Sequence, residues 1–400
     1  MTRAIVLGAG VLGASVAHRL AAAGADVTVI ESGGPAAGTS GATFSVDVTH
    51  LKTPHSYYEL NRRSSAEHLA LGEELDGPAW RHAMPLVQWG NTHAEQHTLR
   101  ERAERLRSWG HPCRFADPRD LRELAPGADP AACTGDELVV HDHASWYDAP
   151  RLVRNLLDRA ALQGAVIHYG VHATGLLRSG DRVTGVVAGA RSWTADWVVN
   201  CTGPYAGRIA ELAGGSLPMA LFPGLVGEST PVPDAPLGAI LAAPGVDLRP
   251  APDDRVLSIS WEIDALLPDA SEAAADRPDL ELELHRRGQA VLTALRAAPR
   301  LAGVRIGVRP VPFDGLPLAG ALPGAPGLYH LVSHSAVNLA PVLGRLAAEE
   351  IMAGGPGAAG VGVGAGAGAL EAYRPDRPTV AEVQDESLKT MSNQSAPAAG

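Results

Sequence analysis

The 400-residue sequence predicts an α/β fold divided between two domains. Near the N-terminus, an apolar run at 4–7 leads through a glycine-rich turn into a helical stretch at 11–23 and a second apolar run at 27–30. This order is typical of a βαβ unit, the building block of parallel sheets. Sheet-forming segments return at 165–201 and after residue 301, on either side of long insertions. One domain is therefore expected to be discontinuous, and the insertions are expected to form the other.

The glycine-rich turn has a spacing with a physical function, Gly8-x-Gly10-x-x-Gly13. Gly8 allows the tight turn, Gly10 lets the backbone approach a pyrophosphate, and Gly13 lets helix and strand pack closely. The helix N-terminus then offers unpaired N–H groups and the positive end of its dipole to the phosphates. Glu31 ends the second strand and is placed to accept hydrogen bonds from an adenosine ribose, which disfavours NADP. The unit predicts a bound dinucleotide; the alternative is a glycine-rich turn that binds nothing.

The spacing of apolar residues predicts the other elements. Helices are expected at 55–76, 94–109, 118–124, 149–162, 205–213 and 280–298. Strands are expected throughout 165–201, in RVLSISWE at 255–262, and at the start of the strand–loop–helix pattern at 327–351. A loop of small residues follows Glu31 at 32–42 and is suited to close backbone contact with a ligand.

These elements suggest a Rossmann-like cofactor domain and an antiparallel-sheet domain that covers the substrate. The expected ranges are 1–80, 146–215 and 301–375 for the first domain, 81–145 and 216–300 for the second, and 376–400 for a flexible tail.

Composition narrows the classes of partner. Hydrophobic residues make up 46% of the chain and charged residues 19%, as in ordinary soluble proteins. A net charge of −11 without a basic stripe argues against nucleic acid or an anionic membrane surface as a partner. Cys113, Cys133 and Cys201 match neither a disulfide framework nor a metal-binding spacing, so we expect a cytoplasmic location and no metal. The Gly/Ala-rich run at 354–368 lacks the bulky side chains of a membrane span.

Four further motifs are more specific than the opening turn. They are GTSGA at 38–42, VVNCTGPYA at 198–206, GVRPVPFDGLPLAG at 307–320 and HSAVNLAPVLG at 334–344. With the opening unit, they resemble the D-amino-acid oxidase family of FAD-dependent oxidoreductases, which includes glycine oxidase and monomeric sarcosine oxidase. The resemblance covers roughly residues 3–375, and the two C-terminal motifs single out this family.

The resemblance implies a bound FAD and assigns its contacts. These fall on Gly8, Gly10, Val11, Leu12, Gly13, Glu31, Ser32, Thr39, Ser40, Val171, Thr202, Gly203, His334, Ser335, Ala336, Val337, Asn338 and Leu339. A helix that begins near Leu339 would also aim its N–H groups at flavin N1 and O2 and stabilise the negative charge of a reduced flavin. The imidazole of His334 either contributes to this loop or only satisfies a hydrogen bond in the core.

Arg309 is the best candidate for a substrate contact, because it matches the arginine with which glycine oxidase clamps the substrate carboxylate. A guanidinium can form two parallel charge-assisted hydrogen bonds with a carboxylate. The alternative is a salt bridge to Asp314 or to another structural acid. Trp261 and Tyr147 are further candidates for the pocket, although a tryptophan at strand spacing often belongs to the core.

The sequence departs from the family pattern at positions that matter for the flavin. Gly307 stands where sarcosine oxidase has the cysteine that tethers its flavin, so noncovalent FAD is expected. Ser258 and Asn338 stand where that enzyme has lysines, which leaves oxidase and dehydrogenase behaviour both open. Lys52 is the only lysine expected near the flavin, and the alternative is a solvated loop lysine. The loop at 335–337 is two residues shorter than in glycine oxidase and lacks its second substrate arginine, which argues against strict glycine specificity.

The expected function is oxidation of a C–N bond in a small amine or amino acid. Hydride would pass from the substrate α-carbon to flavin N5, and the resulting imine would hydrolyse in water. Electrons would leave to O2 or to another acceptor. Two alternatives are a 2-hydroxy-acid dehydrogenase on the same scaffold and a flavin-binding protein without turnover. An NAD dehydrogenase is disfavoured, because a nicotinamide site does not need the DGLPLAG and HSAVNLAP motifs.

Overall fold

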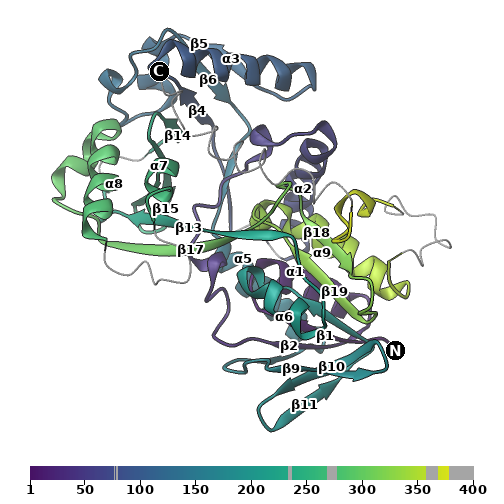
Figure 1. Ribbon diagram of the computed structural model, residues 1–400. Coiled ribbons are helices and arrows are strands. Elements are labelled where there is room, and N and C mark those ends of the chain that lie inside the picture. The colour runs from purple at the N-terminus through teal and green to yellow at the C-terminus, as the bar shows by residue number, and fades with distance from the viewer. Residues whose placement is uncertain (76, 78–79, 233–236, 268–276, 357–367, 378–400) are drawn as a thin grey trace.

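The computed structural model describes residues 1–75, 77, 80–232, 237–267, 277–356 and 368–377. Two bodies make up the fold, one around a six-stranded sheet and one around an eight-stranded sheet (Figure 1). The expected mixed α/β class with two domains is confirmed. Of the expected tail at 376–400, only Asp376 and Arg377 lie within the described residues.

The helices and strands are as follows. The helices are α1 (Val11–Ala22), α2 (His55–Glu74), α3 (His93–Ser108), α4 (Leu121–Leu124), α5 (Ala149–Leu162), α6 (Ala206–Leu212), α7 (Trp261–Asp264), α8 (Pro278–Val291) and α9 (Ala336–Met352). The strands are β1 (Arg3–Leu7), β2 (Asp26–Ile30), β3 (Arg81–Ala83), β4 (Leu86–Trp89), β5 (Arg114–Ala116), β6 (Leu138–His141), β7 (Ser145–Tyr147), β8 (Val166–His168), β9 (Gly175–Ser179), β10 (Arg182–Ala188), β11 (Arg191–Thr194), β12 (Trp197–Asn200), β13 (Met219–Glu228), β14 (Ile240–Ala243), β15 (Val246–Ala251), β16 (Arg255–Ile259), β17 (Gly303–Pro312), β18 (Leu318–Ala321) and β19 (Leu328–Val332).

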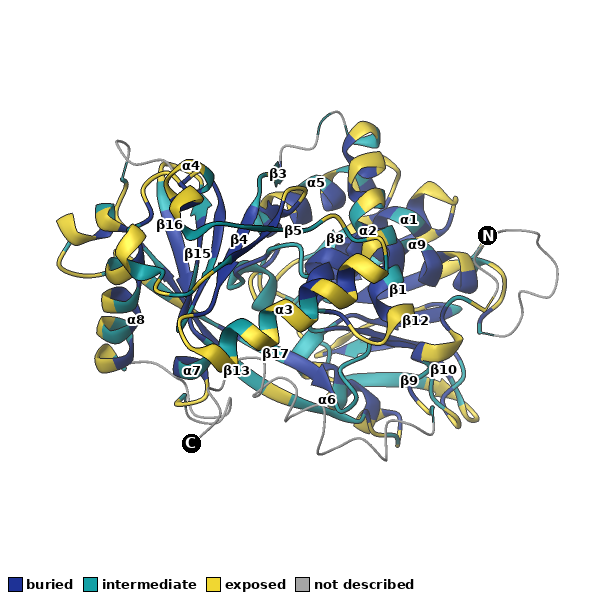
Figure 2. Ribbon diagram, turned by 90° about the horizontal axis from the view of Figure 1, so that it is seen from above, coloured by how far each residue is buried: buried dark blue, intermediate teal, exposed yellow. Residues whose placement is uncertain are grey.

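The six-stranded sheet has the order β18-β19-β12-β1-β2-β8, and only β18 runs antiparallel to its neighbour. Residues of β1 alternate between its two faces. Ala4 and Val6 join the core that contains α1, α5 and α9, whereas Ile5 and Leu7 join the core of the three-stranded sheet β11-β10-β9. Both faces of the central strands are therefore covered, and the region around β1 and α1 is largely dark blue in Figure 2.

The second body is built on the sheet β17-β13-β16-β15-β14-β4-β6-β5. All neighbouring strands run antiparallel except β14 and β4, so the sheet is mixed and not purely antiparallel as expected. The expected domain boundary at residue 301 also needs correction. β17 follows that boundary, but it pairs along its whole length with β13 and belongs to this sheet.

Three element boundaries differ from the expectation for local reasons. The helix expected at 280–298 ends at Val291, because Leu292 is extended, buried and bridged to Ala128. RVLSISWE stops being a strand after Ile259, where the Ser260 hydroxyl accepts the Ile263 N–H and starts α7. The last helix begins at Ala336, three residues before Leu339.

The end of the described chain clamps the first body. Arg374 donates from Nη2 and Nη1 to the two carboxylate oxygens of Glu350 on α9, at 2.6 and 2.8 Å, and the Tyr329 hydroxyl donates to the same carboxylate. Arg377 forms a buried ion pair with Asp314 at 2.7 Å. Residues 368–377 therefore tie together α9, β19 and the turn before β18.

Candidate active site

The turn between β1 and α1 forms a bare backbone cradle. Gly8 has φ of +97°, which favours glycine, and a Cβ there would lie 2.6 Å from the Cys201 carbonyl oxygen. A Cβ on Gly13 would lie 2.0 Å from the Gly8 carbonyl oxygen. Gly10 is the N-cap of α1 without a side-chain cap, and the first turn carries no acid. The positive end of α1 is thus available to an anion.

Glu31 holds the rim of this cradle. Its Oε2 accepts the Ala9 N–H at 2.7 Å, and its Oε1 accepts the Gly33 N–H at 2.6 Å and the Ser32 hydroxyl at 3.3 Å. The Val171 N–H donates to the Glu31 carbonyl, which places Val171 beside this rim. The backbone donors fix the carboxylate at the end of β2, where a ribose would meet it.

The loop 38–42 joins the cradle to the second body. The Ser40 hydroxyl accepts the Val11 N–H at 3.0 Å, and the Thr39 hydroxyl donates to the Val308 carbonyl on β17 at 2.6 Å. At the end of β12, the Thr202 hydroxyl donates to Asn200 Oδ1 at 2.7 Å, and Gly203 follows with φ of +58°. These contacts hold the loop and the end of β12 against the glycine turn.

A cavity of about 790 Å³ lies between the two bodies. Its walls include Thr39 and Ala42 of the loop, Gly307 and Arg309 of β17, and the start of α9. From the second sheet and the elements around it come Gln88, Thr98, Arg102, Asp247, Trp261 and Asp264. Both bodies therefore shape one chamber, which is large enough for a flavin ring beside a small substrate.

The segment 334–339 reaches the cavity at the N-terminus of α9. His334, Ser335, Val337 and Asn338 line it, and Leu339 is fully buried behind them. Burial lowers the pKa of His334 well below its usual value, so the imidazole is neutral. Its Nδ1 is buried and has no hydrogen-bond partner in the described chain. Because the helix begins at Ala336, its first N–H groups lie closer to this histidine than the sequence predicted.

Lys52 is not a solvated loop residue, and that alternative is wrong. It is 7% exposed, and its Nζ donates to the Ser335 hydroxyl at 2.7 Å and lies 3.3 Å from His334 Nε2. Burial lowers the pKa of Lys52 to about 7, against an opposing effect of Asp47. The ammonium therefore titrates near neutrality at the segment that starts α9.

Arg309 is paired, but not with Asp314. Its Nη2 donates to Asp264 Oδ2 at 2.6 Å and to the Pro223 carbonyl at 3.0 Å. Gly224 makes room for this pair, since a Cβ there would lie 2.8 Å from Nη2. Arg309 Nε is buried without a partner, and its guanidinium lies 4.6 Å from the centre of the Trp261 ring. Burial raises the pKa of Asp264, although Arg309 opposes this effect.

The two aromatic candidates occupy different places. Trp261 lines the cavity at the start of α7, outside the strand in which the sequence placed it. Tyr147 is fully buried and does not line the cavity; it stacks on His68 and donates to Asn338 Oδ1 at 3.1 Å. Tyr147 thus contacts the segment behind the cavity wall.

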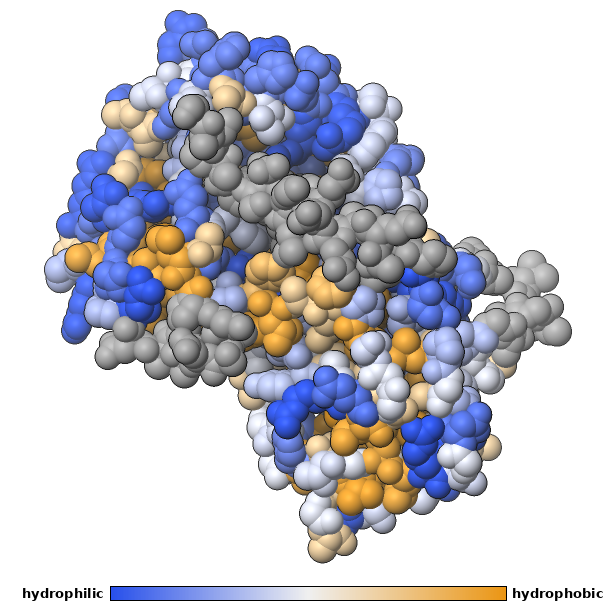
Figure 3. Space-filling model, viewed as in Figure 1, coloured by the Kyte–Doolittle hydropathy of each residue, from blue (hydrophilic) through white to orange (hydrophobic). Residues whose placement is uncertain are grey.

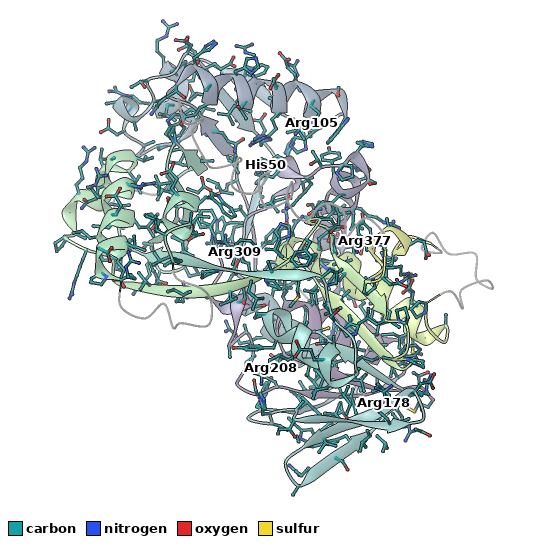
Figure 4. All side chains as sticks on the ribbon, viewed as in Figure 1. His50, Arg105, Arg178, Arg208, Arg309 and Arg377 are labelled. Atoms are coloured by element: carbon teal, nitrogen blue, oxygen red, sulfur yellow. The ribbon has the colours of Figure 1, made fainter. Side chains whose placement is uncertain are left out.

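Several cavity residues were not singled out from the sequence. They are Asp264, Asp247, Arg102 and His50. No local motif marks them, because the elements that carry them meet only in the folded chain. Figure 4 places His50 between α3 and Arg309.

The residues present fit a dinucleotide that carries a flavin. The glycine turn offers backbone N–H groups at the N-terminus of α1, backbone donors hold the Glu31 carboxylate at the end of β2, and the orphaned His334 Nδ1 lies in the chamber wall. In the described ranges, no group of three His, Cys, Asp or Glu residues could hold a metal ion. No helix among them is both long enough and apolar enough to cross a bilayer.

Comparisons with known proteins agree with this fit. The profile of the DAO family, described as FAD dependent oxidoreductase, matches residues 3–350. The glycine oxidase of Pseudomonas aeruginosa is 27% identical over 371 residues, covering 87% of this chain and 94% of the relative. The structure of glycine oxidase from Geobacillus kaustophilus has a TM-score of 0.80 at 20% identity, covering 94% of this chain and 99% of that one. Iminodiacetate oxidase from Chelativorans sp. BNC1 has a TM-score of 0.78 at 22% identity, with coverage of 93% and 99%.

Glu31→Ala is expected to weaken FAD binding by about 1–3 kcal/mol, the usual cost of removing a charged hydrogen-bond partner. Fluorescence titration of the FAD-free protein measures the change. Glu31→Gln is the matched control, because the amide keeps one acceptor for the backbone and for a ribose hydroxyl. Unchanged affinity in a folded Glu31→Ala variant would place the ribose elsewhere.

Lys52→Met is expected to stabilise the protein most at pH 7 and below, and progressively less toward pH 10.5. The folded chain releases the Lys52 proton near pH 7 and the unfolded chain near 10.5, so the parent gains stability as pH rises between them. The gain should approach about 1.4 kcal/mol per pH unit. Denaturant unfolding of both proteins from pH 6 to 10 measures it. A difference that does not vary with pH would contradict a lowered pKa.

Proposed function

The chain belongs to the DAO family of FAD-dependent oxidoreductases, and on that premise we propose that it oxidises a C–N bond of a small amine or amino acid. One observation carries the proposal: Arg309, Lys52 and the start of α9 line the same chamber. The chamber would therefore bring a cation that can bind a substrate carboxylate close to the segment expected to contact the flavin. The glycine oxidase and iminodiacetate oxidase relatives act, by their names, on amino acids, which supports the same substrate class.

FAD would be held without a covalent bond. The pyrophosphate would lie on Gly8, Gly10, Val11, Leu12 and Gly13, and the ribose on Glu31. Gly307 supports noncovalent binding, because a Cβ at this position would lie 2.2 Å from the Ala42 carbonyl oxygen. The backbone therefore has no space for a tethering cysteine there. When bound, FAD supplies the acceptor for a hydride from the substrate α-carbon.

The residues of the chain would orient the substrate and keep it neutral. Arg309 Nη1 forms no hydrogen bond in the described chain, so it remains for a substrate carboxylate. Burial in the chamber excludes water and strengthens such a contact. Lys52, with a pKa of about 7, can hold or accept a proton at Nζ beside the reacting amine. The imine product would then hydrolyse in water.

We propose that molecular oxygen accepts the electrons. Support comes from Lys52, a buried amine beside the segment that would meet the flavin, because its protonated form would stabilise the negative charge that oxygen acquires. The free state of Cys113, Cys133 and Cys201 supports work in the reducing cytoplasm.

The test uses the purified holoprotein. It is expected to be yellow, to release its flavin on acid precipitation, and to bleach anaerobically with amines or amino acids but not with 2-hydroxy acids. Readmitting air should restore the absorbance and form hydrogen peroxide. Bleaching by hydroxy acids alone would favour the dehydrogenase alternative, and no bleaching by either panel would favour a binding protein without turnover. Flavin that stays with the precipitated chain would contradict noncovalent binding.

Arg309→Met is expected to raise the apparent KM for an amino acid while FAD content stays intact. Losing the charge-assisted contact with the substrate carboxylate, which leaves a charged group without its partner, should cost about 2–4 kcal/mol, or tens- to hundreds-fold. Arg309→Lys should rescue only part of the loss, since it lacks the planar fork. The double variant Arg309→Met/Asp264→Asn is the control for an unpaired, buried Asp264. Parent-like kinetics in variants that retain FAD would contradict the assigned role.

A further inference from the structure

One wall of the chamber is a face of α3. Thr98 and Arg102 lie four residues apart on this helix and both line the chamber, so they share one helical face. α3 packs against β4 and β6 of the eight-stranded sheet. Arg102 therefore enters the chamber from the body opposite α9. Its charge also acts on His50, which Figure 4 shows between α3 and Arg309.

Arg102 lacks a counter-charge. It forms no hydrogen bond, ion pair or ring contact in the part of the chain that the structure describes, unlike its neighbours on the same helix. Arg100 pairs with Glu137 at 2.7 Å, and Arg107 lies over the Phe115 ring. The outer surface over α3 is hydrophilic in Figure 3, as expected for arginines that face water. Burial and the nearby cation Arg105 both lower the pKa of Arg102.

The two histidines on which the charge of Arg102 acts are neutral. Burial lowers the pKa of His50 and of His141, and Arg102 lowers both further. Gln88 connects them, with its amide near His50 Nε2 at 3.5 Å and its carbonyl near His141 Nε2 at 3.2 Å. These side chains can orient a ligand by hydrogen bonds, but they leave the charge of Arg102 uncompensated.

The acidic side chains that line the chamber do not pair with Arg102, and Glu262 among them pairs with Arg287. Asp264 is bound to Arg309, and burial together with Asp264 raises the pKa of Asp247 to about 7. Glu95 accepts the N–H groups of Asn91 and Thr92 as part of the α3 capping box. It precedes Arg102 by seven residues, roughly 10 Å along the helix. The two arginines of the chamber thus differ: Arg309 has a carboxylate partner within the protein, and Arg102 has none among the described residues.

Resting on the proposed amine oxidation, we propose that Arg102 binds a second carboxylate, at the end of the substrate remote from the reacting carbon. The preferred substrate class is then an amino acid or N-substituted amine with a distal carboxylate. Arg102 is a partly buried cation without a partner on the chamber wall, and an anionic group of the substrate would supply the charge-assisted hydrogen bonds that the protein does not. A carboxylate fits better than a phosphate, because one guanidinium among neutral imidazoles and amides matches a single negative charge.

Binding without turnover tests the site directly. Glutarate, butyrate and inorganic phosphate would be titrated into the holoprotein while the flavin absorbance is followed. Glutarate should bind at least tenfold more tightly than butyrate, and Arg102→Met should remove this preference. Arg102→Lys should keep part of it, and Arg107→Met, which removes a charge from the outer side of α3, should keep all of it. Equal glutarate affinity in the parent and in Arg102→Met would overturn the proposal. A higher affinity for phosphate than for glutarate would overturn the assignment of a carboxylate as the ligand of Arg102.

Turnover separates this proposal from the one on which it rests. Both enantiomers of glutamate and glutamine would be compared, because the pairs differ in the distal charge. Arg102→Met should lower kcat/KM for glutamate at least tenfold and change the value for glutamine less than twofold. Equal losses on both substrates would overturn the role of Arg102 while amine oxidation stands. If no amine bleaches the flavin but glutarate still binds through Arg102, the proposed function fails and the anion site stands.

Discussion

The contact between loop 38–42 and β17 is the constraint on which the chamber depends. Thr39 is bonded to the Val308 carbonyl, and the backbone at Gly307 approaches Ala42 too closely for any side chain. The same loop holds the first turn of α1 through Ser40. A few residues therefore connect the glycine turn to the eight-stranded sheet. A shift of one body would displace its wall of the chamber relative to the wall formed by the other body.

Charge is distributed unevenly within this fixed space. Lys52 is buried with a pKa near neutrality, Arg309 is already matched by Asp264, and Arg102 is unmatched. Low solvent exposure strengthens the interactions of a charge with its neighbours, most of all at Lys52, which is 7% exposed. The charged side chains are therefore arranged asymmetrically along the chamber. A ligand with negative charge at one end and a neutral amine nearer α9 would be aligned before any chemistry begins.

The sequence predicted the parts of the fold and site that are encoded locally. β1, α1 and β2 fall within a residue or two of their expected bounds, because glycine spacing and apolar periodicity act within the segment itself. The helix at 280–298 ended early and β17 changed sheets, because long-range pairing decided both. The partner of Arg309 and the burial of Lys52 could not be predicted, since Asp264 carries no motif and the 334–344 motif does not reveal that Ser335 contacts Lys52, 283 residues earlier in the chain. Arg102 resembled its exposed neighbours in every local respect.

The clamp formed by residues 368–377 supports the chamber although these residues do not line it. Glu350 lies near the C-terminal end of α9, where Arg374 and Tyr329 bind its carboxylate. The same helix begins at Ala336, beside His334 in the chamber wall. Arg377 likewise fixes Asp314, which directly follows the strand that carries Arg309. The smallest autonomous catalytic unit should therefore extend through Arg377, and a truncation before Gly368 would loosen both walls from behind.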